Sequence, residues 1–174
     1  MDESPESTKS TRSDTTALEV PAPGTAEAPV RVTAQSIGLD ESVSNPTSEN
    51  VEVLDAGLLK GAVRWPTSAQ LGVKGTVLLF GHSSYLLIVH NLAYKAFNHI
   101  QDLKTGATIS VYSATTEYRY RVTGVRIASA TEDVVELPSD KKYLTLVTCD
   151  SFGKKTDRFV VTADFVGTYA IISN

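Results

Sequence analysis

The chain has 174 residues, 41% of them hydrophobic and 21% charged, which is enough for one folded domain with a sizeable core. The net charge of −4 and the lack of a dense basic patch give no support to a nucleic-acid partner. No apolar run approaches the roughly 20 residues of a transmembrane helix, and no signal-peptide core is visible. Contact with a membrane would therefore need an anchor that is absent from this sequence.

Residues 1–28 are rich in Ser, Thr, Pro, Ala and Glu and contain no aromatic residue. Such a composition cannot bury enough apolar surface to offset the entropy of the chain. We therefore predict a disordered N-terminal tail or linker over residues 1–28 and a single folded domain over residues 29–174.

The first half of the folded domain reads as short strands with one short helix. Residues 29–34 alternate as a strand does, and a turn at 36–40 leads into a second strand. A short helix is predicted at about 50–58 and an extended piece at 61–66. Residues 75–82 are apolar on both faces and read as a buried strand, and Gly81 would allow a sharp turn or the close approach of another segment.

The second half continues this pattern. Apolar residues at helical spacing predict a helix from Asn91 to about Leu103, and residues 128–142 read as a polar loop. A change of parity predicts a bulge at Gly124. Further strands are predicted at 108–112, 117–122, 143–150 and 158–165. Many short strands with one or two helices indicate a mainly β fold, closed or sandwiched.

The only cysteine, Cys149, stands at the end of a predicted strand. Because side chains alternate along a strand, Thr145, Val147 and Cys149 share one face, and Leu144 and Leu146 share the other. If the leucines face the core, Cys149 faces a cleft. His82 ends an earlier strand and Arg158 opens the next one. A thiol, a histidine and an arginine at strand ends suggest a nucleophile, a proton carrier and an anion clamp.

Each of these residues also has a structural interpretation. One cysteine excludes an intramolecular disulfide and a cysteine-based zinc cage, and leaves either a buried inert thiol or a reactive one. His82 could be a hydrogen-bonded structural histidine, and Arg158 a solvated charge at a strand edge. His90 and His99 read as surface groups. Three histidines without carboxylates at ligand spacing make only a weak metal site, and no glycine-rich phosphate loop is present, so we expect no metal and no cofactor.

Taken together, these segments resemble the sortases, the cysteine transpeptidases of bacterial cell surfaces. The resemblance runs from about Pro29 to the end of the chain. It is carried by Ser36-Ile37-Gly38-Leu39-Asp40, Gly81-His82, Leu144-Thr145-Leu146-Val147-Thr148-Cys149 and Arg158-Phe159-Val160-Val161. It implies a closed eight-stranded β-barrel of the sortase type, with His82, Cys149 and Arg158 around a groove that Phe80, Thr145 and Val147 would line.

The resemblance also implies a reaction and its partners. Cys149 would attack a sorting signal, typically Leu-Pro-x-Thr-Gly, between Thr and Gly and form a thioacyl enzyme. His82 would transfer protons, and Arg158 would bind the oxyanion or hold the substrate backbone. An amine of a cell-wall precursor or a pilin lysine would accept the acyl group, at the extracellular face of the membrane.

Two other classes of protein remain open at this point. In papain-like hydrolases the cysteine precedes the histidine and begins a helix, whereas here the order is reversed and the cysteine ends a strand. A non-catalytic β-barrel binding module could carry the same residues, and its thiol would not react with electrophiles near neutral pH.

Overall fold

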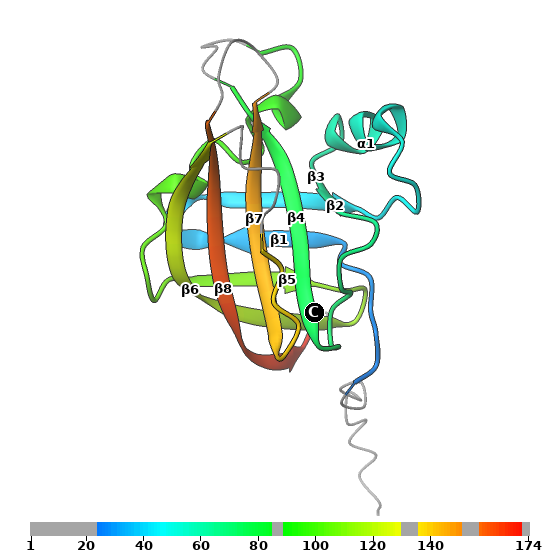
Figure 1. Ribbon diagram of the computed structural model, residues 1–174, viewed down its shortest axis with the longest axis vertical. Coiled ribbons are helices and arrows are strands. Elements are labelled where there is room, and N and C mark those ends of the chain that lie inside the picture. Colours follow the sequence, from blue (N-terminus) through cyan, green and yellow to red (C-terminus); the bar gives the residue numbers. More distant parts are fainter. Residues whose placement is uncertain (1–23, 85–88, 130–135, 151–156, 172–174) are drawn as a thin grey trace, which may run out of the picture.

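The computed structural model describes residues 24–84, 89–129, 136–150 and 157–171, and at Cys149, Asp150 and Asp157 it describes the backbone alone. Within these ranges the chain forms eight strands, one α-helix and three short 3-10 helices (Figure 1). The strands are β1 Arg31–Ala34, β2 Leu39–Ser44, β3 Ala62–Arg64, β4 Gly75–Ser83, β5 Thr108–Tyr112, β6 Thr116–Ser129, β7 Lys142–Asp150 and β8 Asp157–Ala170.

The eight strands close into one barrel in the order β1-β2-β3-β4-β7-β8-β6-β5, with β5 pairing back onto β1. Most neighbours are antiparallel, but β2–β3 and β4–β7 run parallel. Closure leaves no long unpaired edge, which suits a chain of many short strands. The prediction of a closed eight-stranded β-barrel is confirmed.

The barrel interior is filled by apolar side chains that alternate along each strand. Val77 and Leu79 of β4 lie beside Leu144 and Leu146 of β7, and all four are at most 2% exposed. Tyr118 and Tyr120 of β6 add the largest buried side chains, and the ring of Phe165 packs against both. The sequence prediction that the leucines of β7 face the core is therefore confirmed.

The predicted short helix at about 50–58 is present as α1, Val51–Leu58. Asn50 caps its N-terminus, because its side-chain oxygen accepts a hydrogen bond from the Glu52 amide at 2.8 Å. Leu54 and Leu58 are buried on one side of the helix, while Val51 and Val53 are exposed. The face of α1 that carries Leu54 and Leu58 therefore packs against the outside of the barrel.

The predicted helix from Asn91 to Leu103 is wrong. Two separate 3-10 helices, η2 Leu92–Lys95 and η3 Ile100–Asp102, occupy this segment. The apolar spacing correctly marked buried positions such as Phe97 and Ile100, but Leu92 is 78% exposed. The Phe97 amide donates to the carbonyl of His82 at 2.9 Å, so it is not available to continue an α-helical ladder.

The longest pair of strands is β6 and β8, which stay hydrogen-bonded over most of their length despite two register shifts. One shift lies between Val122 and Gly124, which confirms the predicted bulge. The strand continues past it to Ser129, beyond the position where the loop was predicted to begin. Residues 130–135 of that loop lie outside the described residues.

Glu27, two residues before the predicted start of the domain, is hydrogen-bonded to the folded chain. Glu27 forms an isolated bridge with Leu71, and its carboxylate accepts hydrogen bonds from the hydroxyls of Tyr118 and Thr115. Burial, together with the hydrogen bond to the Glu27 carboxylate, raises the pKa of Tyr118 well above its usual value. Residues 1–23 of the predicted tail lie outside the described residues. None of the helices that the structure describes has the length and apolar character required to cross a bilayer.

We predict that Glu27→Ala lowers the free energy of unfolding by about 1–3 kcal/mol, because the hydroxyl of buried Tyr118 loses its acceptor. Urea unfolding measures this loss. Glu49→Ala is the control, since exposed Thr67 is the one side chain among the described residues that donates to Glu49, and it should change stability by less than about 0.5 kcal/mol. Adding Tyr118→Phe to Glu27→Ala should recover part of the loss. Equal effects of the two glutamate substitutions would contradict the role of the Tyr118 contact.

Candidate active site

The candidate site lies where two parallel strands end together. β4 and β7 pair without a break from Gly75–Lys142 to Ser83–Asp150, and this register makes His82 and Cys149 Cα partners. Neighbouring strands lie about 4.8 Å apart, so the two residues are adjacent although 66 residues separate them in the chain. The structure thus brings together the two residues that the sequence singled out for thiol chemistry.

Both residues belong to strand positions on the outside of the barrel. On β4, Val77 and Leu79 face the interior, so Phe80 and His82 alternate to the outer face. On β7, Leu144 and Leu146 face the interior, so Thr145 and Val147 lie on the outer face, as the sequence predicted.

A second apolar cluster, here called the outer cluster, covers this outer face. Leu54 and Leu58 of α1 pack there with Phe80 and Val147, and the ring of Trp65 lies 6.0 Å from that of Phe80. The remaining buried members of the outer cluster are Val63, Ala128 and Val160.

Buried Arg64 holds the segment that carries Trp65. Its guanidinium donates to the carbonyl of Ser68 at 2.6 Å and to the side-chain oxygen of Asn45 at 3.0 Å. Burial lowers the pKa of this guanidinium from its usual value. These hydrogen bonds fix the backbone around Trp65, whose ring lies beside that of Phe80.

His82 is buried, with 8% of its surface exposed. Burial lowers its pKa from the usual 6.5, while the carboxylate of Asp55 on α1 acts in the opposite direction. Its Nδ1 is buried and has no hydrogen-bond partner among the described residues, and the ring of Tyr94 lies 5.4 Å away at a tilt. A buried imidazole kept neutral near neutral pH is suited to accept a proton.

Gly81 is required by the packing behind His82. A Cβ at this position would lie 2.8 Å from the ring of Phe97, the same residue whose amide binds the carbonyl of His82. The close approach predicted at this glycine is therefore present, and it fixes the backbone that carries His82.

Arg158 lies at the start of β8, opposite Ala128 of β6, and it is exposed. The ladder between β7 and β8 is paired as far as Val147–Val160, and counting on by two residues along both strands places Cys149 level with Arg158. The Phe159 amide donates to the hydroxyl of Thr148 at 2.9 Å and keeps the two strands together at this end. The three predicted residues thus lie on three consecutive strands of the barrel.

The predicted groove residues Phe80, Thr145 and Val147 all lie on the outer face, but each is at most 8% exposed. They form a covered floor beside His82. Sequence reasoning missed the residues that cover or approach this floor, namely Leu54, Leu58, Asp55 and Tyr94. The amphipathic spacing of Leu54 and Leu58 was the one available signal.

The other two histidines lie on the surface, as predicted. His90 is exposed, and exposed His99 is 3.2 Å from the carboxylate of Asp102. The described part of the chain contains no cluster of three or more His, Cys, Asp or Glu residues able to hold a metal ion. The cysteine ends a strand that follows the histidine strand, which excludes the papain-like arrangement.

A closed eight-stranded barrel whose parallel strands place a histidine beside the single cysteine defines a class, the β-barrel cysteine transpeptidases. Comparison with known proteins identifies the family within this class. The family model described as the sortase domain matches residues 32–166, which is most of the chain. The chain belongs to the sortase family.

Individual relatives agree with this assignment. The chain is 40% identical to sortase A of Bacillus anthracis over 96 residues, covering 53% of this chain and 45% of that protein. It is 37% identical to the putative sortase YwpE of Bacillus subtilis over 92 residues, covering 51% of this chain and 89% of that protein. The first match spans less than half of the Bacillus anthracis protein.

Solved structures agree as well. The structure of Listeria monocytogenes sortase A superposes with a TM-score of 0.64 at 26% identity, covering 84% of this chain and 92% of that one. Sortase E of Streptomyces avermitilis has a TM-score of 0.61 at 23% identity, over 84% and 93% of the two chains, and shows the shared fold.

We predict that Gly81→Ala destabilises the protein by about 1–3 kcal/mol, because the new methyl group meets the Phe97 ring at 2.8 Å. Gly124→Ala is the control, since its Cβ would lie an ordinary 3.4 Å from the hydroxyl of Thr162. Thermal unfolding of the two variants measures the difference. A Gly124→Ala variant as unstable as Gly81→Ala would show that the Phe97 contact is not the cause.

We also predict a loss of stability on mild acidification. The pKa of His82 is lowered in the folded protein, so the unfolded chain binds more protons just below pH 6.5. The free energy of unfolding should therefore fall as the pH drops from 6.5 through the lowered pKa of the folded state. Urea unfolding between about pH 7.5 and about pH 5 measures this slope.

His82→Gln should flatten the slope, and the control variant His90→Gln, at an exposed position, should keep the slope of the unaltered protein. A slope that survives in His82→Gln would assign the proton uptake to other groups.

Proposed function

We propose that this protein cleaves a sorting-signal peptide through a thioacyl intermediate on Cys149 and transfers the acyl group to an amine. The observation that carries the proposal is the parallel register that pairs His82 with Cys149 at the ends of β4 and β7. We propose that the imidazole of His82 exchanges one proton with the thiol of Cys149 during the reaction.

The first half of the reaction uses His82 in its neutral form. Because burial lowers the pKa of His82, the imidazole is largely neutral near pH 7 and can take the proton of the Cys149 thiol. The sulfur then bonds to the carbonyl carbon of the Thr–Gly peptide bond. The protonated imidazole returns this proton to the leaving glycine nitrogen as the carbon–nitrogen bond breaks, leaving a thioester.

The second half reverses these roles. An incoming amine attacks the thioester carbon and loses a proton to His82, and the carbon–sulfur bond breaks. The thiolate regains a proton from His82, and the product is a new peptide bond. The carboxylate of Asp55 favours the charged imidazole at the intermediate stages, since its effect on the pKa of His82 is upward.

Arg158 and residues of the outer face would bind the substrate peptide. Arg158 is exposed and permanently charged, so its planar donors would hold the oxyanion or a substrate carbonyl beside Cys149. Phe80, Thr145 and Val147 would line the peptide groove once a substrate displaces part of what covers them. Their position beside His82 on the same face supports this role.

The partners follow from the family. Sortases act at the bacterial cell surface on sorting-signal proteins, and we propose that this chain joins such a protein to an amine of a cell-wall precursor or to a pilin lysine. The signal is proposed to be Leu-Pro-x-Thr-Gly or a close variant, and the site of action the extracellular face of the membrane.

The test is to incubate the protein with a library of sorting-signal peptides and an amine and to identify ligated products by mass. The expected result is a product cut between Thr and Gly and joined to the amine, with a thioacyl enzyme detectable in the intact mass. Cys149→Ala should form neither species. Products from Cys149→Ala, or none from the unaltered protein with any peptide, would overturn the proposal.

We predict that Arg158→Lys lowers kcat by about 10²–10³-fold, because a lysine keeps the charge but loses the planar fork of donors. The exposed Arg121→Lys is the matched control and should retain the kcat of the unaltered protein. Alkylation of the thiol by a small neutral reagent should be nearly unchanged in both variants, since it develops no oxyanion. An Arg158→Lys variant with unaltered kcat would make Arg158 a surface charge only.

A further inference from the structure

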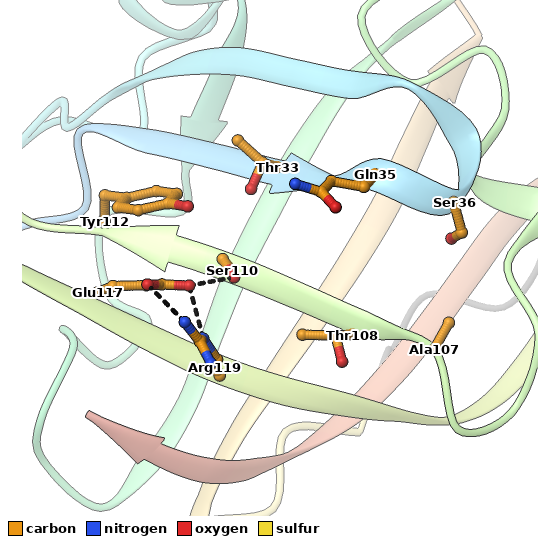
Figure 2. A pocket seen from close by; sticks show the side chains of 9 residues that line it. All are labelled: Thr33, Gln35, Ser36, Ala107, Thr108, Ser110, Tyr112, Glu117 and Arg119. Atoms are coloured by element: carbon orange, nitrogen blue, oxygen red, sulfur yellow. Dashed lines mark hydrogen bonds and ion pairs between the residues drawn. The ribbon is translucent and has the colours of Figure 1, made fainter. Parts of the chain in front are cut away.

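A polar pocket of about 480 Å³ lies on the outer face of β1, β5 and β6 (Figure 2). In the closed strand order, β1 and β5 stand across the barrel from β4 and β7, so this pocket and the candidate active site occupy opposite sides. Its volume is within the range of about 300–1,000 Å³ that small-molecule sites have. Neither the proposed reaction nor the packing of the barrel uses it.

An ion pair between Glu117 and Arg119 forms one wall of the pocket. The carboxylate of Glu117 accepts two hydrogen bonds from Arg119, one from Nε at 2.7 Å and one from Nη2 at 3.1 Å. The hydroxyl of Ser110 donates to the same carboxylate at 2.7 Å, and the guanidinium stands 3.8 Å from the ring centre of Tyr169. Figure 2 shows the hydrogen bonds that join Glu117 to Arg119 and to Ser110. Two side chains held by several contacts each lose little entropy when a ligand binds.

The opposite wall and the floor present free polar groups. Thr33, Gln35 and Thr108 have no side-chain hydrogen-bond partner among the described residues, and neither does the hydroxyl of Tyr112. In Figure 2, Thr33 lies on β1 and Gln35 just after it, and Ser110 of β5 lies between Thr33 and the ion pair. The ring of Tyr112 closes one end, where Arg31 lies 5.4 Å from its centre. The pocket thus offers hydroxyl and amide groups that both donate and accept.

The charge of the pocket is balanced. Among the described residues that line the pocket, Arg119 is the only cation and Glu117 the only carboxylate, and the two neutralise each other at hydrogen-bond distance. An anion would approach the carboxylate, and a metal ion the guanidinium, so neither is favoured. A neutral ligand covered with hydroxyls matches groups of mixed donor and acceptor character, and an aromatic ring at the end suits the apolar face of a sugar.

We propose that this pocket is a binding site for a neutral saccharide. Because it lies across the barrel from His82 and Cys149, the saccharide binds without blocking the peptide groove. The site would hold the protein against a glycan while the reaction proceeds on the other face. The proposal stands on the pocket alone and does not depend on the proposed reaction.

The test is a titration of the isotope-labelled full chain with chitotetraose, cellotetraose and maltotetraose, followed by NMR of the backbone amides. The expected result is saturable shifts at Thr33, Ser110 and Arg119 with at least one sugar, and none at Thr145. Thr108→Trp should fill the pocket and weaken binding roughly tenfold or more. Thr168→Trp is the matched control, an exposed strand position paired with Tyr118, and should bind normally.

The double variant Thr33→Ala/Gln35→Ala removes polar partners without filling the space and should also weaken binding. Cleavage of sorting-signal peptide by Thr108→Trp should equal that of the unaltered protein, which separates this proposal from the proposed function. No saturable shift with any of the three sugars would overturn it. So would shifts confined to the face of β4 and β7, shifts that Thr108→Trp leaves unchanged, or inorganic phosphate binding in the pocket in place of sugar.

Discussion

The parallel pairing of β4 with β7 is the constraint on which the site depends. Parallel neighbours run in the same direction, so their C-terminal ends coincide, and a residue at the end of one strand is adjacent to a residue at the end of the other. His82 and Cys149 meet for this reason alone. A slip of one residue would turn one of the two toward the barrel interior, because side chains alternate faces. The uninterrupted pairing from Gly75 to Ser83 therefore protects the chemistry of the site as well as the fold.

The register is held by apolar burial on both faces of these strands. Inside the barrel, Leu79 and Leu146 are fully buried, and outside it Phe80 and Val147 are covered by the leucines of α1. A strand buried on both faces cannot slip without exposing one apolar set or burying polar groups. The outer cluster thus fixes the register and also removes water from the neighbourhood of His82, whose pKa falls as a result.

The two sides of the barrel differ in how their charged and polar groups are paired. On the side of β1, β5 and β6, the ion pairs Arg31–Asp40 and Glu117–Arg119 satisfy each charge locally. On the side of β4, a buried imidazole nitrogen has no partner within the described residues, which is costly unless a substrate or a neighbouring group uses it. The local charge balance of the first face makes it a surface for neutral ligands. The buried nitrogen of the second agrees with the proton transfer that we propose for His82.

The sequence by itself determined the strand pattern, the bulge at Gly124 and the candidate residues, because alternation and turn residues are local signals. It could not determine the backbone from Asn91 to Leu103, where the apolar spacing was helical but the Phe97 amide is taken by the His82 carbonyl. Only the tertiary structure showed that α1 covers the outer face and that Asp55 and Tyr94 lie near His82. These contacts join segments far apart in the chain, and no local pattern encodes such a distance. The same holds for the pocket at Glu117 and Arg119, which exists because barrel closure brings β5 beside β1.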